Sequence, residues 1–315
     1  MECRRARRGH KIRLVTDSIQ PGLIIKAQSG FFTVETGAGL VLCQLRGKLK
    51  HGKATGDLAA VGDRVNITVS ADGSGAIESV EPRKQALVRL DPRPQGEYQQ
   101  VLLANADQVV FVFACAHPDP RLRMLDRFLV IAEKQSIPAI IVANKIDLVD
   151  DAREIFGMYE SIGYRVLYTS INEKKSVDEL RAALAKKISA LAGPSGVGKS
   201  SLLNVIQPGL GLAVKEISSA VNKGKHTTVT REMFALEGGG YVADTPGWKS
   251  LALWDTEPEE MDAYFPELAS LVPQCQFSDC THVHEPGCAV LAALKAGKVH
   301  PERYDSYLRL RAGQE

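Results

Sequence analysis

The sequence predicts a multidomain α/β chain in three parts, and three observations support this prediction. Short apolar runs separated by glycine turns fill residues 18–85, and apolar strands alternate with amphipathic helices over residues 86–254. Three of the six cysteines then crowd into residues 275–288. The first pattern is typical of a small β-barrel, the second of a parallel sheet covered by helices, and the third of a metal site. We therefore expect a barrel, a central α/β domain and a helical C-terminal domain over residues 255–315.

The composition indicates a globular protein. Of the 315 residues, 44% are hydrophobic and 24% are charged, as in ordinary soluble domains. No apolar run approaches the ~20 residues that span a bilayer, so we expect no membrane partner. We also expect the protein to be cytoplasmic and to act as a monomer. The net charge of +2 does not by itself indicate a nucleic-acid partner, whereas the distribution of the charges is more informative.

A basic tail occupies residues 1–17. Three interpretations of the tail remain open: an arm that binds nucleic acid, an organelle transit peptide, or a solvated segment with no role. Against the single acid Glu2, its basic residues are Arg4, Arg5, Arg7, Arg8, Lys11 and Arg13.

Residues 18–85 predict a five-stranded barrel of the oligonucleotide-binding (OB) type. The expected strands lie at residues 22–25, 31–34, 40–43, 65–69 and 76–80. Their even spacing and the turn residues between them favour a barrel. A basic loop at residues 46–53 joins the third and fourth strands, which suits an RNA-binding barrel, although a barrel with solvated lysines and no ligand fits equally well. Residues 83–105 contain Pro92, Pro94 and Gly96 and predict a linker.

The central part alternates strands and helices. Apolar strands are expected at residues 108–114, 138–143, 165–168 and 188–192. Helical periodicity is found at residues 121–135, 151–163 and 177–187. This alternation predicts a parallel sheet, whose ligands bind at the carboxyl ends of the strands.

A glycine-rich loop between the last of these strands and a helix over residues 201–206 fits the pattern G-x-x-x-x-G-K-[ST]. Backbone amides of such a loop cradle phosphates, its lysine reaches the β- and γ-phosphate oxygens, and its hydroxyl holds Mg²⁺. We assign the lysine to Lys199 and the hydroxyl to Ser200. The loop reads Gly193-Pro194-Ser195-Gly196-Val197-Gly198-Lys199-Ser200 and continues into Ser201.

A guanine-reading motif of the form N-K-x-D ends the strand at residues 138–143. It reads Asn144-Lys145-Ile146-Asp147. The carboxylate of Asp147 can accept two parallel hydrogen bonds, from guanine N1–H and the 2-amino group, which adenine cannot supply. The stem of Lys145 would pack over the base, and Asn144 would brace the loop. Together with the phosphate loop, this motif predicts a guanine-nucleotide site.

Downstream of the phosphate loop the sequence has the parts of a GTPase switch. A hydroxyl-rich stretch contains Thr227 and Thr228, either of which would ligate Mg²⁺. The strand at residues 240–243 then leads into Asp244-Thr245-Pro246-Gly247. Here Asp244 would hold Mg²⁺ through water, and the amide of Gly247 would contact the γ-phosphate. Such segments are ordered by the γ-phosphate and released on hydrolysis.

The order of these motifs is rotated along the chain. In the usual GTPase the guanine reader follows the Asp-x-x-Gly motif, whereas here it precedes the phosphate loop. Because the termini of α/β domains often lie close together, such a circular permutation is physically tolerable. Its consequence is that the segment after Asp244 runs directly into the C-terminal domain.

The C-terminal domain contains the pattern Cys275-x₄-Cys280-x-His282-x₅-Cys288. Three thiolates and one imidazole suit a closed, structural, tetrahedral zinc site. His284 is a rival ligand, and free thiols are the alternative interpretation. The helical tail beyond is equally compatible with contacts to RNA phosphates and with an ordinary solvated face. Its basic residues are Lys295, Lys298, Arg303, Arg309 and Arg311.

The permuted motifs and the cysteine cluster together resemble the RsgA (YjeQ) family of circularly permuted, ribosome-associated GTPases, over about residues 20–310. The resemblance implies an OB barrel, a Mg²⁺-dependent GTPase domain that binds GTP and GDP, and a zinc domain in which His282 is the ligand. It also implies binding to the small ribosomal subunit and its rRNA late in assembly, with GTP hydrolysed to GDP and phosphate when the subunit stimulates it.

The resemblance further implies that His226 is the catalytic residue. Trp248 stands where Ras-like enzymes place the glutamine that orients water, and an indole cannot do this as an amide does. The chain departs from the family at its Ser-Ala-Lys base-contact loop, which here reads Thr169-Ser170-Ile171-Asn172. We expect Ser170 to keep a backbone contact to the base, while the lysine is missing.

Two other functions fit part of the sequence. A guanylate-kinase-like enzyme would share the phosphate loop, but it would leave the motifs at residues 144–147 and 244–247 unexplained. A non-catalytic RNA-binding protein with a structural nucleotide site is the second alternative. The sequence favours the GTPase.

Overall fold

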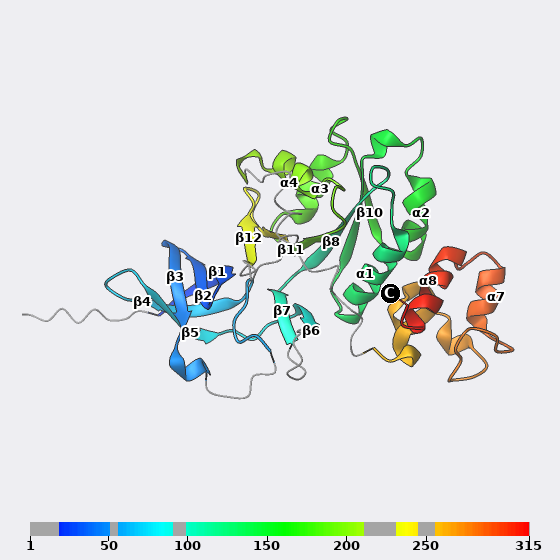
Figure 1. Cartoon of the computed structure of the whole chain (residues 1–315), viewed down its shortest axis with the longest axis horizontal. Coiled ribbons are helices and arrows are strands. Elements are labelled where there is room, and N and C mark those ends of the chain that lie inside the picture. The colour runs from blue at the N-terminus through cyan, green and yellow to red at the C-terminus, as the bar shows by residue number, and fades with distance from the viewer. Residues whose placement is uncertain (1–18, 51–55, 91–98, 211–230, 245–255, 315) are drawn as a thin grey trace, which may run out of the picture.

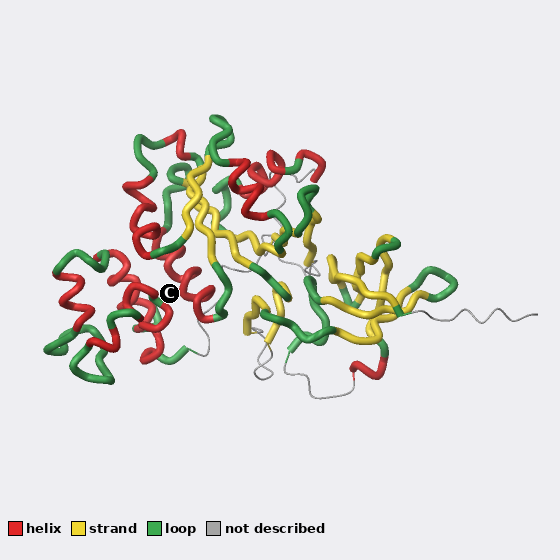
Figure 2. Tube along the Cα trace, turned by 180° about the vertical axis from the view of Figure 1, so that it is seen from behind, coloured by secondary structure: helices red, strands yellow, loops and turns green. Residues whose placement is uncertain are grey.

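The computed structural model describes residues 19–50, 56–90, 99–210, 231–244 and 256–314. Its three parts follow one another along the long axis, with the barrel at one end, the α/β domain in the middle and the C-terminal helices at the other end (Figure 1). Seen from behind, the strands run from the barrel into the central domain, and the far end is helical (Figure 2).

The N-terminal part is a closed five-stranded barrel, as predicted. Its strands are β1 (Gln20–Gln28), β2 (Phe31–Thr36), β3 (Gly39–Leu45), β4 (Arg64–Val69) and β5 (Gly75–Val80). They pair in the order β1-β2-β3-β5-β4, and pairing between β1 and β4 closes the barrel. Alternate residues fill its interior because successive strand side chains point to opposite faces. The fully buried ones include Ile24, Val34, Ile67 and Ile77.

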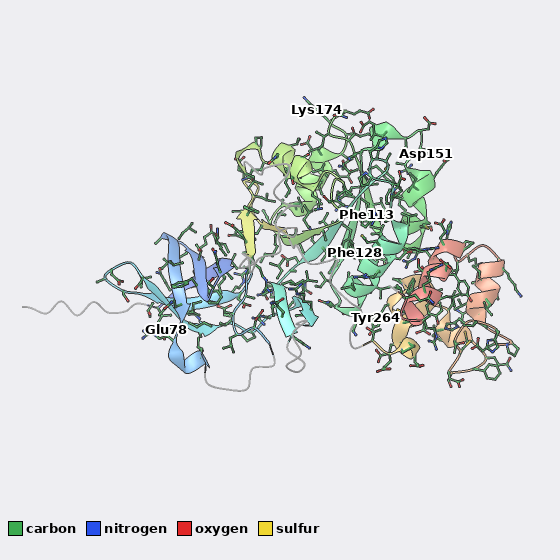
Figure 3. The ribbon with its side chains drawn as sticks, in the orientation of Figure 1. Glu78, Phe113, Phe128, Asp151, Lys174 and Tyr264 are labelled. Carbon is green, nitrogen blue, oxygen red and sulfur yellow. The ribbon has the colours of Figure 1, made fainter. Side chains whose placement is uncertain are left out.

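The predicted basic loop begins with a short 3-10 helix at Gly47–Lys50, and residues 51–55 lie outside the described part of the chain. Its first cation is already paired. Arg46 Nε lies 2.6 Å from Oε1 of Glu78 (labelled in Figure 3), and Arg46 also donates to Thr68. Arg46 therefore braces the barrel rather than standing free for a phosphate.

The predicted linker is wrong for residues 86–90 and 99–104. These residues form an antiparallel pair, β6 (Ala86–Leu90) and β7 (Gln99–Ala104). Leu87, Val101 and Leu103 are buried, so burial of apolar side chains outweighs the local turn signal. The stretch with Pro92, Pro94 and Gly96 lies outside the described residues.

The central domain is built on the predicted parallel sheet. Its strands are β8 (Gln108–Ala114), β9 (Ala139–Asn144), β10 (Arg165–Thr169), β11 (Ile188–Ala192), β12 (Arg231–Ala235) and β13 (Tyr241–Asp244). The order is β10-β9-β8-β11-β13-β12, parallel except for β12. The strand that leads into the phosphate loop, β11, thus lies two places from β9, which ends in the guanine motif.

Among the residues that the structure describes, two helices cover each face of this sheet. Helices α1 (Leu122–Lys134) and α2 (Arg153–Ile162) lie on one side, and α3 (Val177–Leu184) and α4 (Lys199–Ile206) lie on the other. The alternation along β8 explains this arrangement. Phe113 packs on Phe128 of α1 (Figure 3), whereas Val110 and Val112 pack with the α3 and α4 side chains.

The barrel is joined to the central sheet by main-chain hydrogen bonds. Strand β1 pairs with β12, with Lys26 opposite Glu232 and Ala27 opposite Arg231. The side chains of the first pair also meet, with Lys26 Nζ 2.9 Å from Glu232 Oε2. The barrel is therefore bonded to the strand that follows residues 211–230 along the chain.

The C-terminal domain is helical. Its elements are 3-10 helices at Pro258–Tyr264 and Val272–Gln274 and α-helices α6 (Pro266–Ala269), α7 (Ala289–Lys295) and α8 (Pro301–Arg311). Phe265 and Tyr307 pack edge to face in its core, and Val130 of α1 joins the same cluster. Among the described residues, no helix has the length and apolar character needed to cross a membrane.

Candidate guanine-nucleotide site and metal centre

The phosphate loop leaves the end of β11 and enters α4, as its motif requires. Two glycines make its course possible. Gly193 has φ +149°, and a Cβ there would lie 2.1 Å from Val112 O, so the loop packs directly on β8. Gly198 has φ +99°, and a Cβ there would lie 2.4 Å from Asn144 Nδ2. Both positions need glycine for backbone conformation and for space.

The polar groups of the loop converge at the start of α4. Lys199 Nζ lies 2.8 Å from both Gly193 O and Pro194 O, which places the ammonium over the loop. Ser200, 7% exposed, and Ser201 are in the first turn, whose amides have no acceptor within the helix. These amides and the helix dipole favour an anion at this position.

The guanine motif contacts the phosphate loop directly, although the two are separate in sequence. Asn144 donates from Nδ2 to Val197 O over 2.8 Å, and it accepts from Thr169 Oγ1 over 3.0 Å. Lys145 Nζ donates to Gly196 O over 2.7 Å and also to His117 O. The motifs whose order is rotated in the sequence thus form one site in space.

The carboxylate of Asp147 is bonded at both oxygens. Ser170 Oγ donates to Oδ1 over 2.6 Å, and Asn172 Nδ2 donates to Oδ2 over 2.8 Å. These two hydrogen bonds, that of Ser170 first, hold the pKa of Asp147 below its usual range. The group is therefore an ionised acceptor. The amide N–H of Ser170 donates to Lys175 O over 3.3 Å, and the hydroxyl of Ser170 is the group that bonds Asp147.

The remaining predicted residues lie at or beyond the edge of the described structure. Asp244 is the last residue of β13 and pairs with Leu191, which lies in β11 just before the phosphate loop. The side chain of Asp244 is outside the described part of the structure. The other predicted groups also fall in the undescribed ranges. They are His226, Thr227, Thr228, Gly247 and Trp248.

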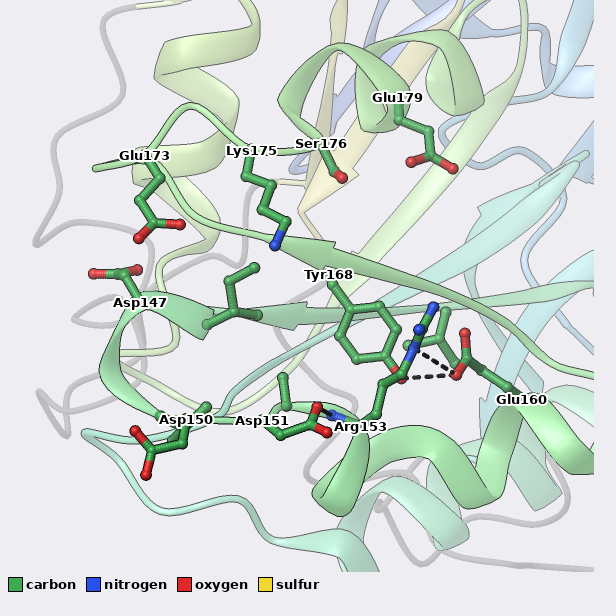
Figure 4. A pocket seen from close by; sticks show the side chains of 14 residues that line it. Asp147, Asp150, Asp151, Arg153, Glu160, Tyr168, Glu173, Lys175, Ser176 and Glu179 are labelled. Carbon is green, nitrogen blue, oxygen red and sulfur yellow. Dashed lines mark hydrogen bonds and ion pairs between the residues drawn. The ribbon is translucent and has the colours of Figure 1, made fainter.

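A cavity of about 610 Å³ opens beside Asp147, on the side of α2 and the start of α3 (Figure 4). Among the described residues that line it, carboxylates outnumber cations six to two, and none belongs to the phosphate loop. Tyr168 donates to Glu160 over 3.0 Å, and Arg153 lies over the Tyr168 ring. This negative cavity would repel phosphates, whereas the amides at the start of α4 favour an anion.

The four predicted metal ligands meet in the C-terminal domain. One ligand atom from each of Cys275, Cys280, His282 and Cys288 lies within 4.8 Å of the others. Nδ1 of His282 is 3.6 Å from Cys275 Sγ and 3.4 Å from Cys288 Sγ. A tetrahedral zinc with ordinary bond lengths requires about 3.6 Å between a sulfur and a nitrogen ligand. The spacing thus fits zinc, whereas His284 is exposed and outside the group.

A carboxylate orients the imidazole of His282 from the side opposite the thiols. Its Nε2 lies 3.0 Å from Asp262 Oδ2, so Nε2–H donates to the carboxylate and Nδ1 faces the thiols. Two tyrosines of α8 fix the backbone of the same loop. Tyr304 donates to His282 O over 2.6 Å, and Tyr307 donates to Thr281 O over 3.0 Å.

Both interpretations of the C-terminal helical tail, a contact to RNA phosphates and a solvated face, are wrong for Arg303. Its side chain is 0% exposed, bonded to Asp126 and Glu267, so it can neither touch RNA nor be solvated. Lys295 and Lys298 are exposed, while Arg309 pairs with Asp305. Local sequence gives no signal for Arg303, because its carboxylate partners lie on other elements of the fold.

Sequence reasoning also missed Asp262 and Asn172. The first carries no motif and reaches His282 only through the fold. For Asn172 there was a signal, since it stands where the base-contact loop loses its lysine.

Comparison with known proteins agrees with this geometry. The family model described as RsgA GTPase matches residues 80–254, and that of the RsgA N-terminal domain matches residues 21–77. A relative from Gemmatimonas aurantiaca is 46% identical, covering 92% of this chain and 96% of its own. One from Moorella thermoacetica is 42% identical, covering 91% and 94%. Both are named small ribosomal subunit biogenesis GTPase RsgA.

Two solved structures share the fold. YjeQ from Thermotoga maritima superposes with a TM-score of 0.77 at 37% identity, covering 94% of this chain and 99% of its own. YloQ, described as a circularly permuted GTPase, has a TM-score of 0.73 at 32% identity, covering 98% of each chain.

A closed barrel, a permuted parallel sheet and a phosphate loop in contact with a guanine motif define a circularly permuted GTPase. The family models and relatives are more specific than that class. The chain belongs to the RsgA GTPase family, which confirms the resemblance drawn from its motifs and rules out the kinase alternative.

Proposed function

We propose that this GTPase binds the small ribosomal subunit, assists its late maturation, and hydrolyses GTP to GDP and phosphate when the subunit stimulates it. The observation that carries the proposal is the direct contact between phosphate loop and guanine motif, through Asn144 and Lys145. The names of the relatives support the subunit as partner.

In this proposal the nucleotide lies along the ends of β9 and β11. Asp147 accepts the paired guanine donors, and the amides of the loop surround the phosphates. Lys199 turns from the loop carbonyls to the β- and γ-phosphate oxygens. Ser200, Thr228 and Asp244 would hold Mg²⁺, and the amide of Gly247 would contact the γ-phosphate. Bound Mg²⁺ would supply positive charge against the phosphate oxygens.

His226 is the residue we assign to hydrolysis. Trp248 follows the Asp-x-x-Gly motif, and its indole cannot orient water as a glutamine amide does. His226 lies two residues before Thr228 in the sequence, so it would accompany the magnesium ligand when the switch orders around the γ-phosphate.

Zinc held by Cys275, Cys280, His282 and Cys288 has a structural role in this proposal. Four protein ligands leave no open position for a substrate or water. The barrel and the exposed Lys295 and Lys298 are the surfaces we assign to rRNA. The protein would act as a monomer in the cytoplasm, where small subunits mature.

Co-sedimentation with purified ribosomal subunits tests the partner. We expect pelleting with small subunits and a non-hydrolysable GTP analogue, with weaker pelleting in GDP, because the γ-phosphate orders the switch. Large subunits serve as the control. Equal binding to both subunits, or binding that ignores the nucleotide, would contradict the proposal.

A further inference from the structure

The loop after β10 holds Asp147 from two sides. Ser170 is fully buried, and its oxygen also accepts from the amide of Glu173 over 3.2 Å, so the hydroxyl that bonds Oδ1 is fixed in place. Asn172 lies on the exposed part of the same turn and reaches back to Oδ2. Main-chain hydrogen bonds between residues 170 and 175 close this turn.

We propose that Asn172 is a positioning residue for guanine recognition, whose side-chain amide fixes the plane of the Asp147 carboxylate. The inference rests on the proposed role of Asp147 as reader of the base. We do not assign the role of the missing family lysine to another cation. Instead, a neutral amide at this position acts on the carboxylate itself.

A carboxylate that is held at only one oxygen can still rotate. The terminal torsion of an aspartate is broad and roughly two-fold, so one hydrogen bond at Oδ1 leaves Oδ2 free to rotate about it. A second bond at Oδ2, from Asn172, removes that freedom. Guanine presents two parallel donors, and a parallel pair requires both oxygens to lie in the plane of the base.

The carboxylate of Asp147 can bind Ser170, Asn172 and the guanine base at the same time. Each carboxylate oxygen has two acceptor positions, about four in all. Ser170 and Asn172 use one on each oxygen. One position on each oxygen remains for the two guanine donors.

The hydrogen bond from Asn172 should matter more for a base that makes two hydrogen bonds to Asp147 than for a base that makes one. Hypoxanthine lacks the 2-amino group and makes a single bond to Asp147, which tolerates a rotated carboxylate. Guanine makes two bonds and does not tolerate it. Loss of the amide of Asn172 should therefore weaken GDP binding and reduce the preference for GDP over IDP.

Binding of fluorescent GDP and IDP to the full chain tests this inference. In Asn172→Ala we expect GDP affinity to fall about three- to tenfold and IDP affinity to change less. Asn172→Asp removes the donor and adds a like charge, so its GDP affinity should fall further. Lys174→Ala is the matched control, because this exposed side chain belongs to the same turn and points away from the domain (Figure 3). It should bind like the parent.

Two results would overturn the inference. Unchanged GDP and IDP affinities in Asn172→Ala would show that Ser170 alone positions the carboxylate. Tighter GDP binding would show that Asn172 competes with the base for the same lone pair.

A variant of Asp147 tests the proposed reading of guanine separately from the role of Asn172. In Asp147→Asn, the new amide can donate to the 2-oxo group of xanthine and accept from its N1–H, so preference should move from GDP to XDP. Without that shift, the proposed reading of the base by Asp147 fails. If the shift occurs while Asn172→Ala binds like the parent, only the role of Asn172 fails.

Discussion

Arg303 of α8 and Asp126 of α1 form a buried ion pair between the C-terminal and GTPase domains, with Nη1 2.7 Å from Oδ1. Their side chains are 0% and 1% exposed. Arg303 also binds Glu267, and Asp126 accepts from Ser306 and Tyr159. Burial alone would lower the pKa of Arg303, but the two carboxylates outweigh it and raise that pKa above its ordinary value. The guanidinium therefore stays charged and docks one domain on the other.

Replacing Arg303 by Met should destabilise the docked domains. The change leaves Asp126 and Glu267 as buried charges without a cation, which costs about 3–5 kcal/mol. Urea unfolding measures the loss. Arg309→Ala on the same helix is the matched control, because its pair with Asp305 is exposed and worth about 0–1 kcal/mol. Equal stability of the two variants would show that the buried pair does not hold the domains together.

Asp262→Ala should weaken zinc binding without removing any ligand. The carboxylate fixes His282 with Nδ1 toward the thiols, and loss of such a partner lowers metal affinity about 10- to 100-fold. Competition with a chromophoric chelator measures the affinity. The exposed His284 supplies the control, since His284→Ala should retain the metal fully. The account of the site is contradicted if His284→Ala loses zinc and Asp262→Ala does not.

Gly198→Ala should abolish nucleotide binding while the protein remains folded. The added Cβ would lie 2.4 Å from Asn144 Nδ2, at a φ of +99° that alanine rarely adopts. Either the loop or the guanine motif must shift. Gly209→Ala is a control with open space around its Cβ. Calorimetric titration with GDP distinguishes the two, and tight binding by Gly198→Ala would refute the contact described between the motifs.

Local patterns predicted much of the fold and the site. Each barrel strand, the phosphate loop and the N-K-x-D motif are contained in a few consecutive residues, so their types and spacing were enough. The metal cluster was predicted for the same reason, although the choice of His282 over His284 came from the family resemblance.

The features that sequence reasoning missed depend on contacts between distant residues. Arg303 looks like a solvated cation because its partner Asp126 lies 177 residues away. The β6–β7 pair was hidden by the prolines between its strands. Pairing of β1 with β12 joins strands that lie before the guanine motif and after the phosphate loop in the sequence, and no local signal marks it.

GTP hydrolysis by the purified chain, alone and with small ribosomal subunits, tests the central claim most directly. We expect stimulation of GTP turnover by small subunits, no turnover of ATP, and loss of the stimulated rate in His226→Ala with GTP affinity retained. Tight GTP binding with no stimulation would contradict a subunit-stimulated GTPase. Equal turnover of ATP would contradict guanine recognition by Asp147.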